Sequence, residues 1–409
     1  WARRERAAAG EAAALAVLET ARARCPADPD LANQQAALYL AERRFASALA
    51  ALDGIGGEAA RHPYVLCNRG SALTGLGRLD EAEACFEAVL AESPAMFEAV
   101  FGRAVVAFDR RDDGAAEAGL KAALALRPEN FEARFRLAEV LARRFRFDEA
   151  RAVLEEVLAA DPANFTALYQ IGVLHYLCDR YAEAVEWGRR ALAADPERKE
   201  VFDLIGLALV GCGRFAESAA CFADAARLAV PQAPTYASNQ AFIPHYDPTR
   251  SADDLLAVHR AWGERFGGRG DDPEARFANS PEPERRLRIG YLSPDLRAHS
   301  VAYFTIPLIA QHDRAAFEVF AYSATDKPDR VTAWIAEHVD VWRDVMGMSA
   351  DAVRAAIAAD RIDILVDLAG HTAGNLLPVL ARRAAPVQVT YIGYPDTTGV
   401  PAIDYRIVD

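Results

Sequence analysis

Residues 131–164 read FEARFRLAEVLARRFRFDEARAVLEEVLAADPAN, and the small residues and the proline of this stretch recur every 34 positions along the first half of the chain. One series of small residues consists of Ala36, Gly70, Ala104, Ala138, Gly172 and Gly206. A second series in step with it consists of Ala48, Ala82, Ala116, Ala150, Ala184 and Ser218. The proline series consists of Pro94, Pro128, Pro162 and Pro196. Three series in phase indicate an internal repeat.

Each repeat is interpreted as two antiparallel helices. Small residues lie where the helices cross closely, proline lies where the second helix must end, and large residues such as Leu137 and Leu154 fill the space between. Such a unit cannot bury its apolar face alone, so neighbouring units stack into a superhelix with a long concave surface. The sequence therefore predicts six repeats over about residues 29–231. Residues 5–25 resemble the last helix of a further unit.

After residue 231 the period ends, and residues 232–286 are predicted to be a linker that contains one helix, at 251–266. From Leu287 onward, β-rich runs alternate with helical patterns. The β-rich runs are 287–293, 317–323, 362–368 and 387–393. The helical patterns cover about 300–313, 330–338, 349–360 and 374–383. Apolar strands with helical crossovers predict a parallel sheet covered on both faces, which is an α/β Rossmann-like lobe at 287–409.

Composition excludes several classes of protein. The formal net charge of −13 disfavours a nucleic-acid binder, which needs clustered basic residues, and no apolar run is long enough to span a bilayer. The six cysteines form no CxxC pair, so no metal site is expected and a cytoplasmic location is predicted. The chain starts at Trp1 rather than Met and ends in a predicted strand, so we expect a fragment cut at both ends.

Polar loops follow three of the predicted strands, at the edge where ligands bind in parallel sheets. The loops are Ser293–Ser300, Asp367–Thr372 and Gly393–Gly399. Neither GxGxxG nor GxxxxGK[ST] occurs, which argues against a dehydrogenase or a kinase.

The first two of these loops contain histidines that could take part in chemistry. His299 could be a general base, oriented by Asp295 four residues earlier. The alternative is a histidine that caps the following helix, with Asp295 closing a turn. Likewise, His371 and Thr372 could face a ligand or could stabilise their own loop by a hydrogen bond.

The glycines of the third loop allow a ligand to approach the backbone of Gly393, but they also suit an ordinary turn.

Three stretches resemble a known family: RIGYLSPDLRAHSVAYF (288–304), IDILVDLAGHTAGNLLPVLARRAAPVQVTYIGYPDTTG (362–399) and IDYRIVD (403–409). They are similar to the amino-terminal catalytic lobe of O-linked N-acetylglucosamine transferases, including bacterial members and plant SPINDLY-type relatives. Together with the preceding repeats, the resemblance covers nearly the whole chain.

The resemblance implies a two-lobed GT-B glycosyltransferase that needs no metal and no cofactor. It would transfer N-acetylglucosamine from the nucleotide sugar UDP-GlcNAc to a Ser or Thr hydroxyl, with inversion at the sugar carbon. The partner would be a protein or peptide acceptor lying along the repeat groove, with neither nucleic acid nor membrane involved. The second lobe would follow Asp409, so residues 1–409 alone should be inactive.

By the same resemblance, His299 is a site residue next to the sugar and the acceptor hydroxyl, with Asp295 as its acidic companion. The GYP-containing loop would approach the donor sugar through Gly393, Tyr394, Pro395 and Thr397. His371 and Thr372 would lie on the same wall of the cleft.

Two alternatives to this function remain at this point. One keeps the enzyme and changes the donor to GDP-fucose or another nucleotide sugar, and the other is an inactive repeat scaffold.

Animal members of the family line the repeat groove with an asparagine ladder, and this chain departs from that pattern. The matching positions here are Gln34, Asn68, Gly102, Arg136, Gln170 and Leu204.

Overall fold

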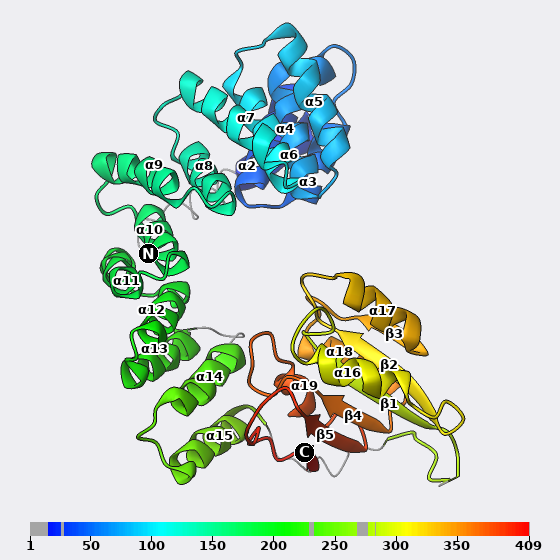
Figure 1. Cartoon of the computed structure of the whole chain (residues 1–409). Coiled ribbons are helices and arrows are strands. Elements are labelled where there is room, and N and C mark those ends of the chain that lie inside the picture. Colours follow the sequence, from blue (N-terminus) through cyan, green and yellow to red (C-terminus); the bar gives the residue numbers. More distant parts are fainter. Residues whose placement is uncertain (1–14, 26–27, 229–232, 268–276, 283, 409) are drawn as a thin grey trace. The chain divides into compact units, whose positions relative to one another are not determined.

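The computed structural model describes residues 15–25, 28–228, 233–267, 277–282 and 284–408 (Figure 1). Contacts divide the chain into two compact units, Trp1–Cys178 and Asp179–Asp409, and each is described by itself. Among the described residues, no helix is both long enough and apolar enough to cross a membrane.

The first unit consists of helices that follow one another in pairs, after a helical stretch at residues 15–24. The helices are α2 (Pro29–Ala41), α3 (Phe45–Asp53), η1 (Ala59–Arg61), α4 (Pro63–Gly75), α5 (Leu79–Glu92), α6 (Phe97–Asp109), α7 (Asp113–Leu126), α8 (Phe131–Arg143), α9 (Phe147–Ala160) and α10 (Phe165–Leu177). Pro94, Pro128 and Pro162 each follow the end of a second helix by two residues. The predicted all-α repeat array is therefore confirmed in this unit.

Small residues lie where the paired helices cross, as predicted. A Cβ atom on Gly70 would lie 2.7 Å from the ring of Phe86, so a larger residue there would force the ring to move. Ala82, which lies one turn before Phe86 on the same helix, has no exposed surface. Helix contact this close lets each pair bury its apolar stripe against the next pair.

The turn inside each pair contains a residue in the left-handed region, and this feature also recurs every 34 positions. The residues and their φ angles are Arg43 (59°), Gly77 (74°), Arg111 (61°), Phe145 (60°), Asp179 (57°) and Gly213 (69°). Only two of the six are glycine, so no sequence series revealed the position. The short turn imposes the conformation even on residues that disfavour it.

Substitutions at this turn should change stability in opposite directions. Gly77→Ala should destabilise the array by about 1 kcal/mol, because a Cβ atom makes the left-handed conformation costly although nothing lies near it. Arg111→Gly should stabilise it by about 0.5–1 kcal/mol by relieving that strain. Urea unfolding of the two variants measures both values, and a change of the same sign in both would contradict the backbone explanation.

The second unit begins with helices that continue the array. These are α11 (Tyr181–Ala194), α12 (Lys199–Gly211), α13 (Phe215–Leu228), α14 (Ala233–Phe242), η2 (Ile243–Tyr246) and α15 (Ala252–Phe266). The predicted helix 251–266 is confirmed as α15, which begins with a capping box between Ser251 and Asp254.

The prediction that residues 232–286 hold a single helix is wrong. They also contain α14 and the short helix η2, and α14 packs on α13. The sequence of α14, APTYASNQAF, has no clear apolar period, so its stability comes from tertiary packing. Its Ala237 belongs to a buried cluster with Trp262 of α15 and Leu377 of the lobe.

The lobe contains a six-stranded sheet in the order β3-β2-β1-β4-β5-β6, in which every pairing is parallel. The strands are β1 (Leu287–Ser293), β2 (Phe317–Ser323), β3 (Val341–Asp344), β4 (Ile364–Asp367), β5 (Val387–Tyr391) and β6 (Tyr405–Ile407). The helices are α16 (Ala302–Ala310), α17 (Arg330–His338), α18 (Ala350–Ala359) and α19 (Leu377–Leu380). The predicted α/β lobe is confirmed. β3 was not among the four predicted runs because it is short and half exposed.

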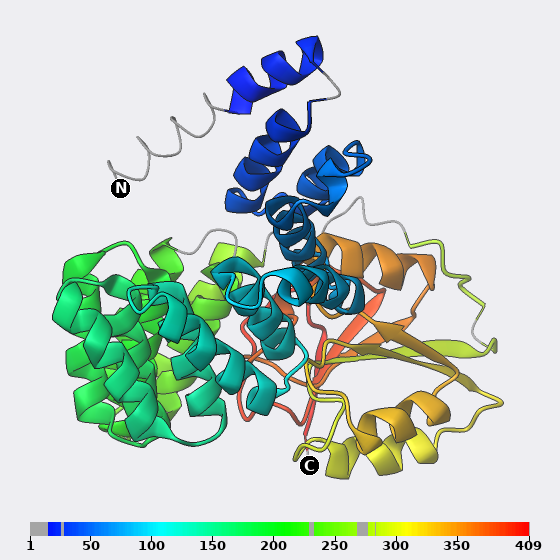
Figure 2. The same cartoon turned by 90° about the horizontal axis from the view of Figure 1, so that it is seen from above.

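Helices cover both faces of the sheet (Figures 1 and 2). Ile289 and Tyr291 of β1 share a buried cluster with Ile309 of α16 and Ile335 of α17. Leu292 of β1 faces the other way and packs in a cluster with residues of α18 and α19. Burial on both faces explains why the strands read as continuous apolar runs.

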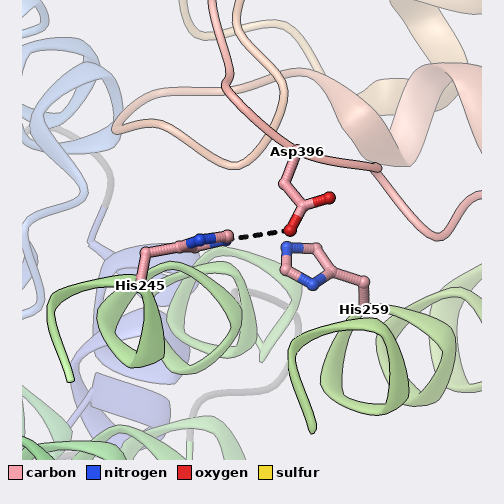
Figure 3. Close-up of side chains that lie close together, drawn as sticks. All are labelled: His245, His259 and Asp396. Carbon is pink, nitrogen blue, oxygen red and sulfur yellow. Dashed lines mark ion pairs between the residues drawn. The ribbon is translucent and has the colours of Figure 1, made fainter. Parts of the chain in front are cut away.

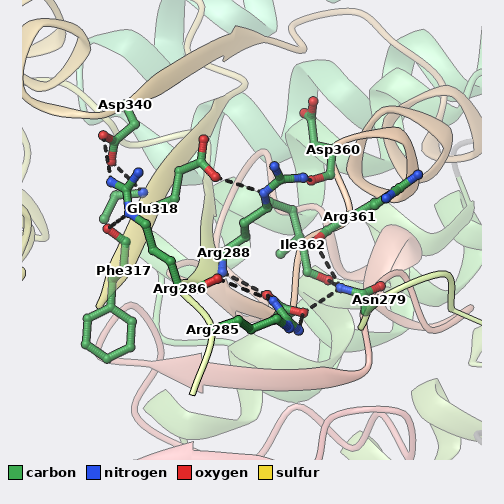
Figure 4. A network of polar contacts seen from close by, with 12 residues as sticks. Asn279, Arg285, Arg286, Arg288, Phe317, Glu318, Asp340, Asp360, Arg361 and Ile362 are labelled. Atoms are coloured by element: carbon green, nitrogen blue, oxygen red, sulfur yellow. Dashed lines mark hydrogen bonds and ion pairs between the residues drawn. The ribbon is translucent and has the colours of Figure 1, made fainter. Parts of the chain in front are cut away.

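Ion pairs join the strands near their amino ends, opposite the carboxyl ends that the three loops follow (Figure 4). Asp363 pairs with Arg285, accepts from Asn279 Nδ2 (2.6 Å) and accepts from the backbone N–H of Arg288 (2.8 Å). Burial alone would raise the pKa of Asp363, but the hydrogen bonds from Arg285, Arg288 and Asn279 outweigh it and lower the pKa. The carboxylate thus attaches the segment before β1 to the lobe.

Asp363→Asn should lower the free energy of unfolding by about 2–3 kcal/mol at neutral pH, since it leaves Arg285 without its charged partner. Asp351→Asn is the matched control, because its pair with Arg382 is exposed and should contribute less than about 1 kcal/mol. Urea denaturation compares the two variants. Equal losses would show that the position of Asp363 confers no special stability.

Candidate functional site

The candidate site lies at the carboxyl edge of the sheet, between β1 and β4. The strand order runs outward from β1 in one direction and from β4 in the other, which makes this gap the topological switch point of the sheet. The loop after β1 and the loop after β4 therefore flank the position where parallel sheets bind ligands.

The structure brings Asp295 and His299 together on the loop after β1. Asp295 is buried, and its Oδ1 lies 3.9 Å from His299 Nε2 and 3.5 Å from the guanidinium of Arg297. The first separation suits an ion pair and is too long for a hydrogen bond. The backbone N–H of Val301 donates to His299 Nδ1 at 3.4 Å. Because the side chain of His299 is 37% exposed, its ring can be reached by a ligand.

The loop after β4 is held by a buried carboxylate. Asp367 accepts from the backbone N–H groups of Ala369 (3.1 Å) and Gly370 (2.9 Å) and from Thr390 Oγ1 (2.8 Å). Burial raises the pKa of Asp367 against the effect of these hydrogen bonds. Thr372 Oγ1 donates to the carbonyl of Ala369 at 2.8 Å, so its hydroxyl closes this same turn.

His371 is buried inside the second unit. Its Nε2 lies 2.8 Å from the carbonyl of Thr398, and its Nδ1 lies 3.1 Å from Ser238 Oγ. A carbonyl only accepts, so Nε2 donates to Thr398 and Nδ1 accepts from the serine hydroxyl. Burial lowers the pKa of His371 to about 3. This geometry favours the alternative in which His371 stabilises loops, and a role in sugar binding stays a prediction.

The loop after β5 begins with a sharp change of direction at Ile392, whose φ is 53°. A Cβ atom on Gly393 would lie 1.7 Å from the carbonyl oxygen of Leu368, so glycine is required there by the neighbouring loop. Pro395 is exposed, and its carbonyl accepts from Arg406. Thr397 is half-buried, and its Oγ1 accepts from the backbone N–H of Gly399 at 3.2 Å.

Tyr394 is the buried member of this loop, and its hydroxyl is shared by two histidines that the sequence did not assign to the site. The hydroxyl lies 2.6 Å from His259 Nε2 on α15 and 3.0 Å from His245 Nε2 on η2. His245 Nε2 also lies 3.7 Å from Asp396 Oδ2 (Figure 3). These histidines fall in the segment predicted to be a linker, and only the fold shows that they meet Tyr394.

His245, His259 and Asp396 offer ligand atoms within 4.8 Å of one another, close enough to be tested as a metal site. The histidine nitrogens that would bind a metal ion already take part in hydrogen bonds. His259 Nδ1 donates to the carbonyl of Leu255 at 2.6 Å, and the Tyr394 hydroxyl contacts Nε2 of both histidines. These contacts explain the cluster without an ion, and the expectation that the protein needs no metal stays a prediction.

The depressed pKa of His371 predicts a pH-dependent stability. The unfolded chain takes up a proton near the ordinary histidine pKa of about 6.5, whereas the folded chain does so only near pH 3. The unfolded state therefore binds more protons between these values, and stability should fall as the pH drops through this window. His371→Gln keeps a donor for Thr398 but cannot titrate.

Urea denaturation at pH 7.0, 6.0 and 5.0 should therefore show a smaller loss of stability in His371→Gln than in the wild type. Every other titratable group is common to the two proteins, so the difference between their slopes isolates the contribution of His371. Parallel curves for the two proteins would show that His371 does not titrate as its burial requires.

The structure thus consists of a helical repeat array and a parallel α/β lobe with polar loops at its topological switch point. Residues 272–409 match the model of glycosyl transferase family 41, and residues 67–120 and 146–198 match a tetratricopeptide repeat model. The match to the family 41 model confirms the resemblance to O-linked N-acetylglucosamine transferases.

Named relatives agree with this family. The chain is 46% identical over 175 residues to a probable UDP-N-acetylglucosamine–peptide N-acetylglucosaminyltransferase SPINDLY of Petunia hybrida, and 45% identical over 161 residues to that of Arabidopsis thaliana. These matches cover 42% and 38% of this chain, but only 19% and 18% of the plant proteins. A solved structure of a mutant form of Thermobaculum terrenum O-GlcNAc transferase is 33% identical with a TM-score of 0.55. That match covers 67% of this chain and 52% of the other, so the chain spans about half of that structure.

Proposed function

We propose that this protein transfers N-acetylglucosamine from UDP-N-acetylglucosamine to Ser or Thr hydroxyls of proteins. The observation that carries the proposal is the Asp295–His299 pair at the switch point of a family 41 lobe that follows protein-binding repeats. The printed names of the plant relatives support the donor and a peptide acceptor.

In the proposed reaction, the acceptor hydroxyl attacks the anomeric carbon of the sugar from the face opposite the nucleotide. A new C–O bond forms as the bond to the diphosphate breaks, which inverts the configuration, and UDP leaves with the bonding electrons. His299 would accept or hold the proton of the acceptor hydroxyl, and Asp295 would stabilise the imidazolium that results. The exposure of His299 and the burial of Asp295 suit these two roles.

The loop 393–399 is proposed to contact the donor sugar. Pro395 and Thr397 are its exposed and half-buried members, whereas Tyr394 is buried and Gly393 is in close contact with the β4 loop. We therefore assign the direct contact to Pro395 and Thr397. Gly393, Tyr394, His371 and Thr372 support it by shaping the loops.

The acceptor is proposed to bind along the repeats. An apolar pocket of about 460 Å³ lies between α8, α9 and α10, and Tyr169, Gln170 and Val173 of α10 line it together with Phe145 and Leu177. Such a pocket suits an apolar side chain of a peptide. Among the ladder positions, Gly102, Arg136 and Leu204 carry no side-chain amide, so a continuous amide ladder is not available for backbone recognition.

Radiolabelled transfer by the full-length protein tests the proposal. His299→Ala should reduce kcat roughly 10²–10⁴-fold, the usual contribution of a positioned acid–base group. His338→Ala is the matched control, because it removes an exposed histidine of the same lobe, at the end of α17, and should leave kcat unchanged.

Equal rates for His299→Ala and the wild type would remove His299 from the chemistry. Transfer from GDP-fucose but not from UDP-N-acetylglucosamine would contradict the donor.

A further inference from the structure

We infer that His259 and His245, which precede the lobe, are positioning residues that hold the donor-facing loop 393–399 through the hydroxyl of Tyr394. The inference rests on the proposed function for the role of the loop, but the anchoring itself rests on contacts within the second unit. By this inference, η2 and α15 hold the loop of the candidate site in place and are more than a linker between the repeats and the lobe.

The hydrogen-bond donors and acceptors around Tyr394 permit one arrangement. His259 Nδ1 faces the carbonyl of Leu255 at 2.6 Å and must donate to it, which leaves Nε2 of the neutral ring as an acceptor. The Tyr394 hydroxyl then donates to His259 Nε2 at 2.6 Å and accepts from His245 Nε2 at 3.0 Å. Every polar atom at the hydroxyl is satisfied, which fixes the direction of the tyrosine side chain.

The far end of the loop is held by backbone contact with the same helix. A Cβ atom on Gly399 would lie 2.0 Å from the carbonyl oxygen of His259, and one on Gly263 would lie 1.8 Å from the carbonyl oxygen of Gly399. The two glycines therefore allow α15 and the loop to touch without side chains between them. His371 adds its hydrogen bond to the carbonyl of Thr398, next to Gly399.

The loop is thus anchored at Tyr394 and again at Thr398 and Gly399, while the residues between the anchors remain accessible. Pro395 is exposed, and Asp396 and Thr397 are half-buried. A short segment held at both ends has few conformations to lose on binding a ligand, so the anchors should act on donor affinity.

Burial favours the uncharged forms of the side chains that hold the loop. Burial lowers the pKa of His259 and raises the pKa of Tyr394, so both are uncharged near neutral pH. The rings of His245, His259, His371 and Tyr394 lie against one another with centroids 5.1–5.7 Å apart, which fills the space around the hydroxyl. The only carboxylate that faces the group among the described residues is Asp396, near His245.

The test uses three single variants of the full-length protein, the double variant His259→Ala/Tyr394→Phe and one control. His259→Ala and Tyr394→Phe each remove one side of the short hydrogen bond, and His259→Gln keeps an acceptor at the position of Nε2. Tyr291→Phe is the matched control, since it removes another tyrosine–histidine hydrogen bond of a buried tyrosine in the lobe, to His312 Nε2 at 2.7 Å, in which no residue of 393–399 takes part.

Steady-state kinetics and hydrogen–deuterium exchange are measured for each variant. His259→Ala and Tyr394→Phe should raise the donor KM about tenfold with little change in kcat, the effect of one lost buried hydrogen bond. Peptides covering 393–399 should exchange faster in both. The double variant should be no worse than either single variant, and His259→Gln should recover most of the affinity.

An unchanged donor KM together with unchanged exchange in His259→Ala would overturn the inference. So would an equal rise in KM for Tyr291→Phe, which would mean that any loss of stability weakens donor binding. A wild-type protein that transfers no sugar contradicts the proposed function instead. Exchange of residues 393–399 still decides in that case whether the histidines hold the loop, and no difference between the wild type and His259→Ala would overturn the anchoring.

Discussion

The packing around the buried side chain of Trp262 joins the helices of the second unit to the lobe, and the rest of the unit depends on it. Trp262 belongs to a buried cluster with Ala226 of α13, Ala237 of α14, and Leu377, Val400 and Ala402 of the lobe. Its indole N–H donates to the carbonyl of Pro234 at 3.1 Å. A helical array and a parallel sheet have no common backbone hydrogen-bond pattern, so side-chain packing of this kind joins them, together with side-chain hydrogen bonds such as that between Ser238 and His371. The cluster around Trp262 joins the helices to the lobe and leaves the carboxyl ends of the strands free for the loops of the candidate site.

This packing between the helices and the lobe brings together the polar residues around Tyr394. Once α15 lies against the loop before β6, His259 faces the tyrosine hydroxyl, and the backbones of Gly263 and Gly399 touch. The loop after β5 is then supported from the helical side, whereas the loop after β1 is supported from within the lobe by Asp295 and by Asp329, which accepts from the backbone N–H of Ala298 at 2.8 Å. The two walls of the proposed cleft therefore depend on different parts of the chain.

Much of the candidate site was predictable because it lies within short stretches of sequence. Asp295 and His299 are four residues apart on one loop, so their approach follows from local spacing, and the structure confirms it. His371 and Tyr394 were correctly placed on rim loops, but the sequence could not show that both are buried, or that Ser238, His245 and His259 meet them. Those partners are more than 130 residues away along the chain, so no local pattern of sequence links them to the rim loops.

The sequence by itself determined the repeat period, the change to strands and helices at Leu287 and the family resemblance, because each rests on periodic burial or on a contiguous motif. The structure alone decided the left-handed turns at Arg111 and Phe145, the helix α14 and the anchoring of Tyr394. In these cases the local preference is weak or contrary, and the free energy comes from contacts between distant segments. Packing therefore selects conformations and partners that no window of sequence specifies.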